Sequence, residues 1–147
     1  MTGTGRYILV VNAGSSSIKF AVFDYHLTQI TAGQISDIGG AAQLVVADEK
    51  ETVSAPDHSA AISEIFAALS KSGHPLNSFS AVAHRVVHGG ANLTKACEVT
   101  TEVLDEIRTC VPLAPLHNPH NISAIEIVSE LAPGLPQFAS FDTAFHA

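Results

Sequence analysis

The hydrophobic pattern near the N-terminus predicts a β-hairpin with a polar tip. Residues 8–11 (ILVV) form a continuous apolar run, as expected of a strand that is buried on both faces. A second run occupies residues 18–23 (IKFAVF), in which Ile, Phe and Val alternate with Lys, Ala and Phe. The loop between the runs reads NAGSSS, so a glycine and three hydroxyl groups lie between the strands. We expect the rest of the chain to be organised around this hairpin.

Further strands are predicted at intervals along the chain. Residues 27–38 and 43–48 carry Thr, Val and Ile between glycine breaks, which predicts antiparallel strands. Residues 79–87 (FSAVAHRVV) and 137–142 (QFASFD) also have the composition of strands. The acidic run DEKE at residues 48–51 is expected to form a solvated turn.

Helices are predicted where apolar side chains recur every three or four residues. The first is expected after an N-cap at Asp57, with its apolar stripe within residues 62–69. A second is expected to begin at residue 100 or 101. The third should have Asn118 as its N-cap and Pro119 at its first position. Its predicted apolar stripe consists of Ile122, Ile125, Val128 and Leu131.

Length and composition restrict the class of protein. A chain of 147 residues suffices for one domain with its own core, and a hairpin followed by alternating helices and strands indicates a mixed α/β fold. The 46% hydrophobic and 14% charged content excludes a disordered protein. A net charge of −7, with only 7 Lys and Arg, argues against a nucleic-acid partner. No apolar run approaches the ~20 residues of a membrane span, and no signal peptide is evident, so we expect a cytoplasmic protein without a membrane partner.

The hairpin loop is a candidate phosphate site. Gly14 permits close approach of a ligand to the backbone, Ser15 and Ser17 offer hydroxyl and N–H donors, and Lys19 supplies a positive charge. Asn12 precedes them directly after the first strand. An ordinary serine-rich turn is the alternative interpretation. The loop is not a Walker A motif, because it lacks a second glycine and Lys19 leads into a strand and not a helix.

The loop resembles the N-terminal signature of the acetate kinases, which belong to the hexokinase and actin superfamily. The motifs HRVVHGG (84–90), LAPLHNP (113–119) and FDTAFH (141–146) resemble later motifs of that family and occur in the same order. The resemblance implies a mixed five-stranded sheet flanked by helices, the ribonuclease H-like ATPase fold. It covers essentially the whole chain, but the chain corresponds only to the N-terminal domain of such an enzyme.

The resemblance also implies roles for single residues. Arg85, whose planar fork can hold a carboxylate or a phosphoryl group, is the first candidate for charge stabilisation. His117 corresponds to the histidine that hydrogen-bonds the phosphoryl group in the transition state. Asp142 resembles the aspartate that places Mg²⁺ or its water, and Asn12 would contact the metal's water or a phosphate. A surface ion pair for Arg85 and a structural role for His117 are the alternatives.

The substrate pocket is expected beside Arg85. Val87 lies two residues from Arg85 on the same strand face, and Leu116 precedes His117, so both could contact the acetate methyl group. Ordinary core packing is the alternative for both. His84 and His88, or His117 and His120, could also suggest a zinc site, but no H-E-x-x-H motif or cysteine cluster supports one.

The resemblance implies ATP, ADP and acetate as ligands, Mg²⁺ as the metal and a homodimer for the full-length protein. Propionate or butyrate kinase on the same scaffold, and a phosphate-binding module without turnover, remain alternatives. Two departures from the family pattern matter. His120 stands where relatives commonly have a second proline, and the chain ends at Ala147, before the second, nucleotide-binding domain. We therefore expect the isolated chain to fold but to be inactive.

Overall fold

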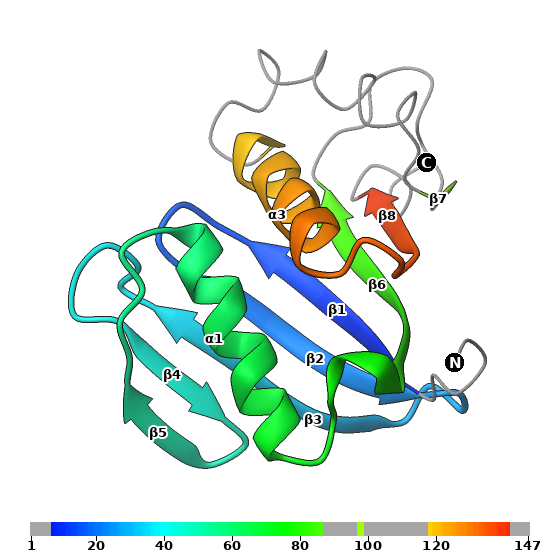
Figure 1. The fold of residues 1–147 in the computed structure, drawn as a ribbon, viewed down its shortest axis with the longest axis horizontal. Helices are drawn as coiled ribbons and strands as arrows, with labels where there is room; N and C mark the ends of the chain where they lie inside the picture. The colour runs from blue at the N-terminus through cyan, green and yellow to red at the C-terminus, as the bar shows by residue number, and fades with distance from the viewer. Residues whose placement is uncertain (1–6, 87–96, 99–117, 142–147) are drawn as a thin grey trace.

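The computed structural model describes residues 7–86, 97–98 and 118–141, and these form one sheet with helices on it (Figure 1). The sheet has eight strands in the order β5-β4-β3-β2-β1-β6-β8-β7. The strands are β1 (Tyr7–Ala13), β2 (Ile18–Asp24), β3 (Gln29–Ser36), β4 (Gln43–Val46), β5 (Glu49–Thr52), β6 (Phe79–Val86), β7 (Cys97–Glu98) and β8 (Gln137–Phe141). The helices are α1 (His58–Lys71), the short 3₁₀ helix η1 (Leu76–Ser78) and α3 (Asn118–Leu131).

The predicted hairpin is confirmed. Strands β1 and β2 pair antiparallel from Tyr7–Asp24 at the open end to Ala13–Ile18 at the loop. Within β1 the buried side chains alternate with more exposed ones, so one face of the strand enters the core, and the expected burial of both faces was wrong. The paired Val11 and Phe20 are both buried on that face. The hairpin is therefore a rigid base for the loop at residues 14–17.

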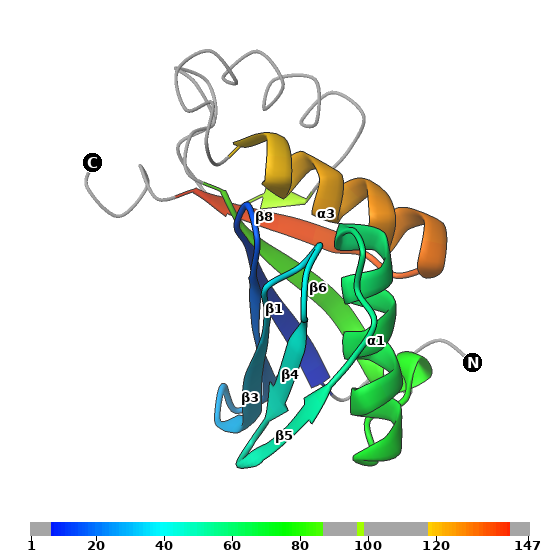
Figure 2. The ribbon, with the colours of Figure 1, turned by 90° about the vertical axis from the view of Figure 1, so that its left-hand side faces the viewer.

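The two α-helices of the described residues cover the same face of the sheet (Figures 1 and 2). The Asp57 side chain accepts a hydrogen bond from the Ala60 N–H at 2.8 Å, which confirms the predicted N-cap of α1. Helix α1 buries Ala61, Ile62, Ile65 and Leu69 against the sheet. Helix α3 buries Ile122, Ile125 and Val128 as predicted, whereas Leu131 is 38% exposed, so its assignment to the stripe was wrong because the helix ends there at the surface.

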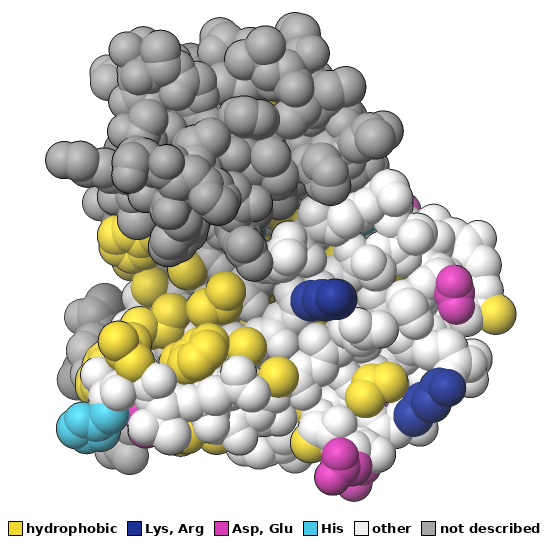
Figure 3. Space-filling view, turned by 180° about the vertical axis from the view of Figure 1, so that it is seen from behind, with side chains coloured by type: hydrophobic (Ala, Val, Ile, Leu, Met, Phe, Trp, Pro, Cys, Tyr) yellow, Lys and Arg dark blue, Asp and Glu magenta, His cyan; other side chains and the backbone are white. Residues whose placement is uncertain are grey.

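The opposite face of the sheet is less well covered. Its half-buried side chains include Ile8, Val10, Ala21 and Phe23. Figure 3 shows this side of the molecule, where hydrophobic side chains gather in one region of the surface. Within the described ranges no helix lies on this face. The described helices are also not long and apolar enough to cross a membrane.

The mixed α/β class is confirmed, but the sheet is larger than the five strands expected. The five central strands, β3-β2-β1-β6-β8, form the expected mixed sheet, and β4, β5 and β7 extend its two edges. Residues 48–51 were predicted as a turn, and this was wrong for Glu49 onward. The turn lies at Ala47, which has a positive φ of 54°, and Glu49–Thr52 pairs with β4 as a strand whose side chains are all exposed. The helix predicted from residue 100 lies outside the described residues.

Candidate functional site

Three parallel strands end on the same side of the sheet, where the backbones of the candidate residues Asn12 and Arg85 lie. Strand β6 pairs parallel with β1 and with β8, so the carboxyl ends of all three lie together. The register pairs Val11 with His84, and Arg85 with Ser140. Asn12 is the residue after Val11 and Arg85 is the residue after His84, so the two lie at neighbouring positions on adjacent strands. In the sequence Asp142 comes directly after Phe141, the last residue of β8. Ligands of open α/β sheets bind at this end of the strands.

Asn12 and Lys19 lie directly opposite each other at the base of the hairpin loop. They are cross-strand partners in the register of β1 and β2, and both side chains are exposed. Directly opposite residues of an antiparallel pair project from the same face of the sheet. A neutral amide and a cation therefore stand side by side where the loop begins, an arrangement that suits an anion.

Two carbonyl groups of the loop accept hydrogen bonds from backbone N–H groups of the same domain. The Ser17 carbonyl accepts from the Gly14 N–H at 2.8 Å, and the Ser16 carbonyl accepts from the Ile38 N–H at 3.0 Å. The peptide bonds are trans and planar, so the C=O and N–H of one peptide unit point in opposite directions. The N–H of Ser17 is thus directed away from Ile38. Ser15 and Ser16 are exposed at the tip.

Helix α1 begins beside this loop. The ring of His58, its first residue, has Nε2 2.7 Å from the Gly14 carbonyl oxygen. The carbonyl can only accept, so Nε2 is the donor. Our reading of the sequence missed His58, because a lone histidine after an N-cap carries no pattern that indicates its partner 44 residues away.

Helix α3 begins near the carboxyl ends of these strands. It packs against β1 and β6, and its first turn lies toward the arrowhead ends of β6 and β8 (Figure 2). The helix begins at Asn118, one residue earlier than expected, a difference within the usual variation of helix boundaries. Free N–H groups at a helix N-terminus attract anions, so this end of the sheet suits an anionic ligand.

His84 is buried and does not belong to the exposed part of the site. Its side chain is 1% exposed, and its Nε2 lies 2.6 Å from the Gln137 side-chain oxygen. Burial lowers the pKa of His84 from 6.5 to about 4, against the raising effect of the Gln137 hydrogen bond. Burial therefore favours the neutral form of His84. No group of three or more potential metal ligands occurs in the described part of the chain.

Several of the candidate residues cannot be compared with the structure. Val87, Leu116, His117 and Asp142 lie outside the described residues. For Arg85 the structure gives the backbone position in β6 and its pairing with β8. Their roles as catalytic or substrate-binding residues remain predictions. What the structure does bring together is Asn12, Lys19 and the loop at residues 14–17.

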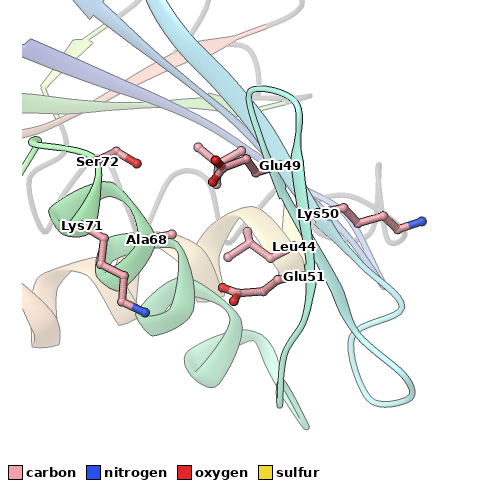
Figure 4. Close-up of a pocket in the computed structure, with 8 residues that line it drawn as sticks. Leu44, Glu49, Lys50, Glu51, Ala68, Lys71 and Ser72 are labelled. Carbon is pink, nitrogen blue, oxygen red and sulfur yellow. The ribbon is translucent and has the colours of Figure 1, made fainter.

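A pocket of about 450 Å³ lies elsewhere, between the β4–β5 hairpin and the end of α1 (Figure 4). Its lining includes Leu44, Glu51 and Lys71, while the Lys50 side chain points away from the helix. Strand β5 is at one edge of the sheet, and β6 and β8 are near the other. This pocket is therefore separate from the carboxyl ends of the parallel strands.

Comparison with known protein families and sequences agrees with the motifs. The Acetokinase family matches residues 7–147. The acetate kinase of Sulfurovum sp. (strain NBC37-1) is 40% identical over 146 residues, covering 95% of this chain and 37% of that protein. The acetate kinase of Desulfitobacterium hafniense (strain DSM 10664 / DCB-2) is 43% identical over 150 residues, covering 95% of this chain and 38% of that protein.

Solved structures show the same relationship. The crystal structure of Porphyromonas gingivalis acetate kinase superimposes with a TM-score of 0.89 at 32% identity, covering 96% of this chain and 38% of that one. A propionate kinase from Francisella tularensis subsp. tularensis SCHU S4 gives a TM-score of 0.90 at 34% identity, with the same coverage. The chain thus spans about 38% of the length of these relatives.

Proposed function

Because the chain belongs to the Acetokinase family, we propose that it is the part of an acetate kinase that holds the carboxylate and the transferred phosphoryl group. The reaction would be ATP + acetate ⇌ ADP + acetyl phosphate. The observation that carries the proposal is the hairpin loop at the carboxyl end of β1, next to the paired Asn12 and Lys19. The exposed serines of this loop can donate hydrogen bonds and Lys19 is a neighbouring cation, which together suit phosphate oxygens.

Phosphoryl transfer to a carboxylate brings two anions together, so the site must offset their repulsion. We propose that Arg85, at the end of β6, binds the acetate carboxylate or the migrating phosphoryl group with its planar fork. His117 would donate a hydrogen bond to the phosphoryl oxygens from the start of α3. Gly14, Ser15, Ser17 and Lys19 would hold the phosphates of the nucleotide.

The family uses ATP, and we propose Mg²⁺ as the divalent metal. In the described structure the Asn12 amide is exposed but faces Lys19, so it fits a contact to a metal-bound water or phosphate better than direct coordination of a cation. We propose that Asp142 supplies the carboxylate, because Mg²⁺ commonly binds through one or two carboxylates and the phosphates of its substrate. Bound there, Mg²⁺ would neutralise charge on the phosphates.

The choice of carboxylate is a separate proposal. We propose that Val87 and Leu116 contact the acetate methyl group. Propionate is the second candidate, because the similar structure from Francisella tularensis is described as a propionate kinase. One methylene changes binding by only ~1–3 kcal/mol, so the same scaffold can serve either acid.

The chain spans about 38% of the length of its relatives, so we propose that it is part of a longer protein. We propose that residues 1–147 are its N-terminal domain and that a second domain binds adenosine. A cytoplasmic homodimer without nucleic-acid or membrane partners is proposed for the whole enzyme.

The test is hydroxamate trapping of acyl phosphate by the full-length protein supplied with ATP and Mg²⁺. Acetate, propionate and butyrate are compared at equal concentration, and ATP without carboxylate is the control. We expect carboxylate-dependent turnover with the highest kcat/KM for acetate. Binding of ATP without acyl phosphate formation from any of the acids would indicate a phosphate-binding module and would overturn the proposal.

A further inference from the structure

His58 joins the start of helix α1 to the hairpin loop. Its Nε2 donates to the Gly14 carbonyl at 2.7 Å, and this contact links residues 44 positions apart in the sequence. The ring is partly buried, and it stands on a helix whose first turn is fixed by the Asp57 cap. The donor is thus held by a rigid element, while the acceptor belongs to a glycine, the residue with the most backbone freedom.

The hydrogen bond determines which way one peptide unit of the loop faces. The C=O of Gly14 and the N–H of Ser15 belong to the same planar trans peptide, so they point in opposite directions. Because the carbonyl is directed at His58, the Ser15 N–H is directed away from α1. In the same way, the hydrogen bond from the Ile38 N–H fixes the direction of the Ser16 carbonyl, and thereby directs the Ser17 N–H of the same peptide unit away from Ile38.

We propose that His58 is a positioning residue for phosphate binding, which holds the Gly14–Ser15 peptide so that the Ser15 N–H faces the ligand's phosphate oxygens. This inference rests on the proposed function, because it takes the nucleotide phosphates as the ligand of the loop. Without the His58 contact, the peptide can rotate and present its carbonyl oxygen to the phosphate. An oxygen there would repel an anion, whereas the N–H attracts it.

The test uses three variants of the full-length enzyme. His58→Leu removes the donor at similar volume, and His58→Gln keeps an N–H donor at about the position of Nε2. His74→Leu is the matched control, because His74 is also a half-buried histidine but packs edge-to-face against Tyr7, with ring centroids 4.7 Å apart, away from the loop. Urea unfolding of each variant shows that it is folded under the assay conditions.

We expect His58→Leu to raise the KM for ATP by about tenfold, the effect of losing one orienting hydrogen bond, and to leave the KM for acetate within about twofold. His58→Gln should recover most of the loss, and His74→Leu should change neither constant. Equal effects of His58→Leu on ATP and acetate, no effect on ATP, or a Gln variant as impaired as the Leu variant would overturn the proposal.

Failure of the proposed function would be seen separately. If the wild-type protein forms no acyl phosphate, ADP binding is measured by calorimetry on the same variants. Weaker binding of ADP to His58→Leu than to His58→Gln would then support the positioning role without the kinase activity. Equal ADP affinity, or no detectable ADP binding to the wild type, would overturn it.

Discussion

The Nε2 atom of His84 lies 2.6 Å from the side-chain oxygen of Gln137, and both residues are buried. The Gln137 amide nitrogen donates to the Ile125 carbonyl at 3.2 Å and to the Ser129 hydroxyl at 2.8 Å. The amide oxygen must therefore face His84, which makes His84 Nε2 the donor. This network ties β6 and α3 to the first residue of β8.

Gln137→Leu should destabilise the chain by about 1–3 kcal/mol, because it leaves the buried His84 N–H without its acceptor. Urea unfolding of the 147-residue chain measures the change. Gln29→Leu in β3 replaces an exposed glutamine in the same way and should change the stability by less than about 0.5 kcal/mol. Equal losses for the two variants would show that the network contributes no specific stability.

The free energy of unfolding should also decrease as the pH is lowered through a defined window, because of His84. Burial lowers its folded-state pKa to about 4, from 6.5 in the unfolded chain. Above pH 6.5 both states are neutral at this residue. As the pH falls from 6.5 to 4, the unfolded chain gains a proton that the folded chain does not, so up to ~3 kcal/mol of stability is lost.

The pH effect is measured by urea unfolding from pH 7 to pH 4. His84→Gln should lower the stability at pH 7 and reduce the slope of stability against pH within that window. The comparison of the two slopes removes the contribution of the other histidines. If the slopes of the wild type and the variant coincide, His84 does not remain neutral in the folded chain.

The stability of the chain should respond differently to alanine at Gly33 in β3 and at Gly14 in the hairpin loop. A Cβ at Gly33 would overlap the Val45 carbonyl oxygen and come within 2.7 Å of Phe20 Cζ, so Gly33→Ala should cost at least about 1–3 kcal/mol. A Cβ at Gly14 would meet the Ser17 carbonyl oxygen at an ordinary 3.5 Å, and its φ is not in the left-handed region. Gly14→Ala should therefore leave stability within about 0.5 kcal/mol of the wild type.

Gly14→Ala should instead lower kcat/KM for ATP in the full-length enzyme by about tenfold or more, because a methyl group would stand where phosphate approaches the backbone. Unfolding and steady-state kinetics on both variants separate the two effects. A destabilised Gly14→Ala with unchanged kinetics would assign the glycine to the fold and not to the ligand.

Val87→Ala should shift the full-length enzyme toward propionate and butyrate by about 1–2 kcal/mol in relative specificity, because a smaller side chain enlarges the proposed pocket. Specificity constants for the three acids measure the shift. Val45→Ala in β4, at the far side of the sheet, is the control and should not alter their ratio. An unchanged ratio in Val87→Ala would show that Val87 only packs in the core.

The sequence predicted the parts of the fold whose signals are local. The hairpin followed from apolar runs on either side of a polar loop, and α1 followed from Asp57 and the helical spacing of Ile62, Ile65 and Leu69. Strand β5 was missed because Glu49–Thr52 has no buried side chain and is held only by backbone pairing with β4.

The candidate site was predictable only where its residues belong to one short stretch of the sequence. Asn12 and Lys19 were chosen from the loop motif, and the register then placed them opposite each other. The contacts of His58 with Gly14 and of His84 with Gln137 join residues 44 and 53 positions apart, and depend on how the elements pack. A periodic pattern carries no information about such pairs.

Arg85→Ala in the full-length enzyme tests the central claim most directly, because the account assigns the stabilisation of transferring charge to the end of β6. Hydroxamate trapping with ATP, Mg²⁺ and acetate measures turnover, and Lys71→Ala, at the exposed end of α1, is the control for loss of one positive charge. The account predicts that turnover falls by about 10²–10³ in Arg85→Ala and stays unchanged in Lys71→Ala. Turnover of Arg85→Ala within about threefold of the wild type would contradict it.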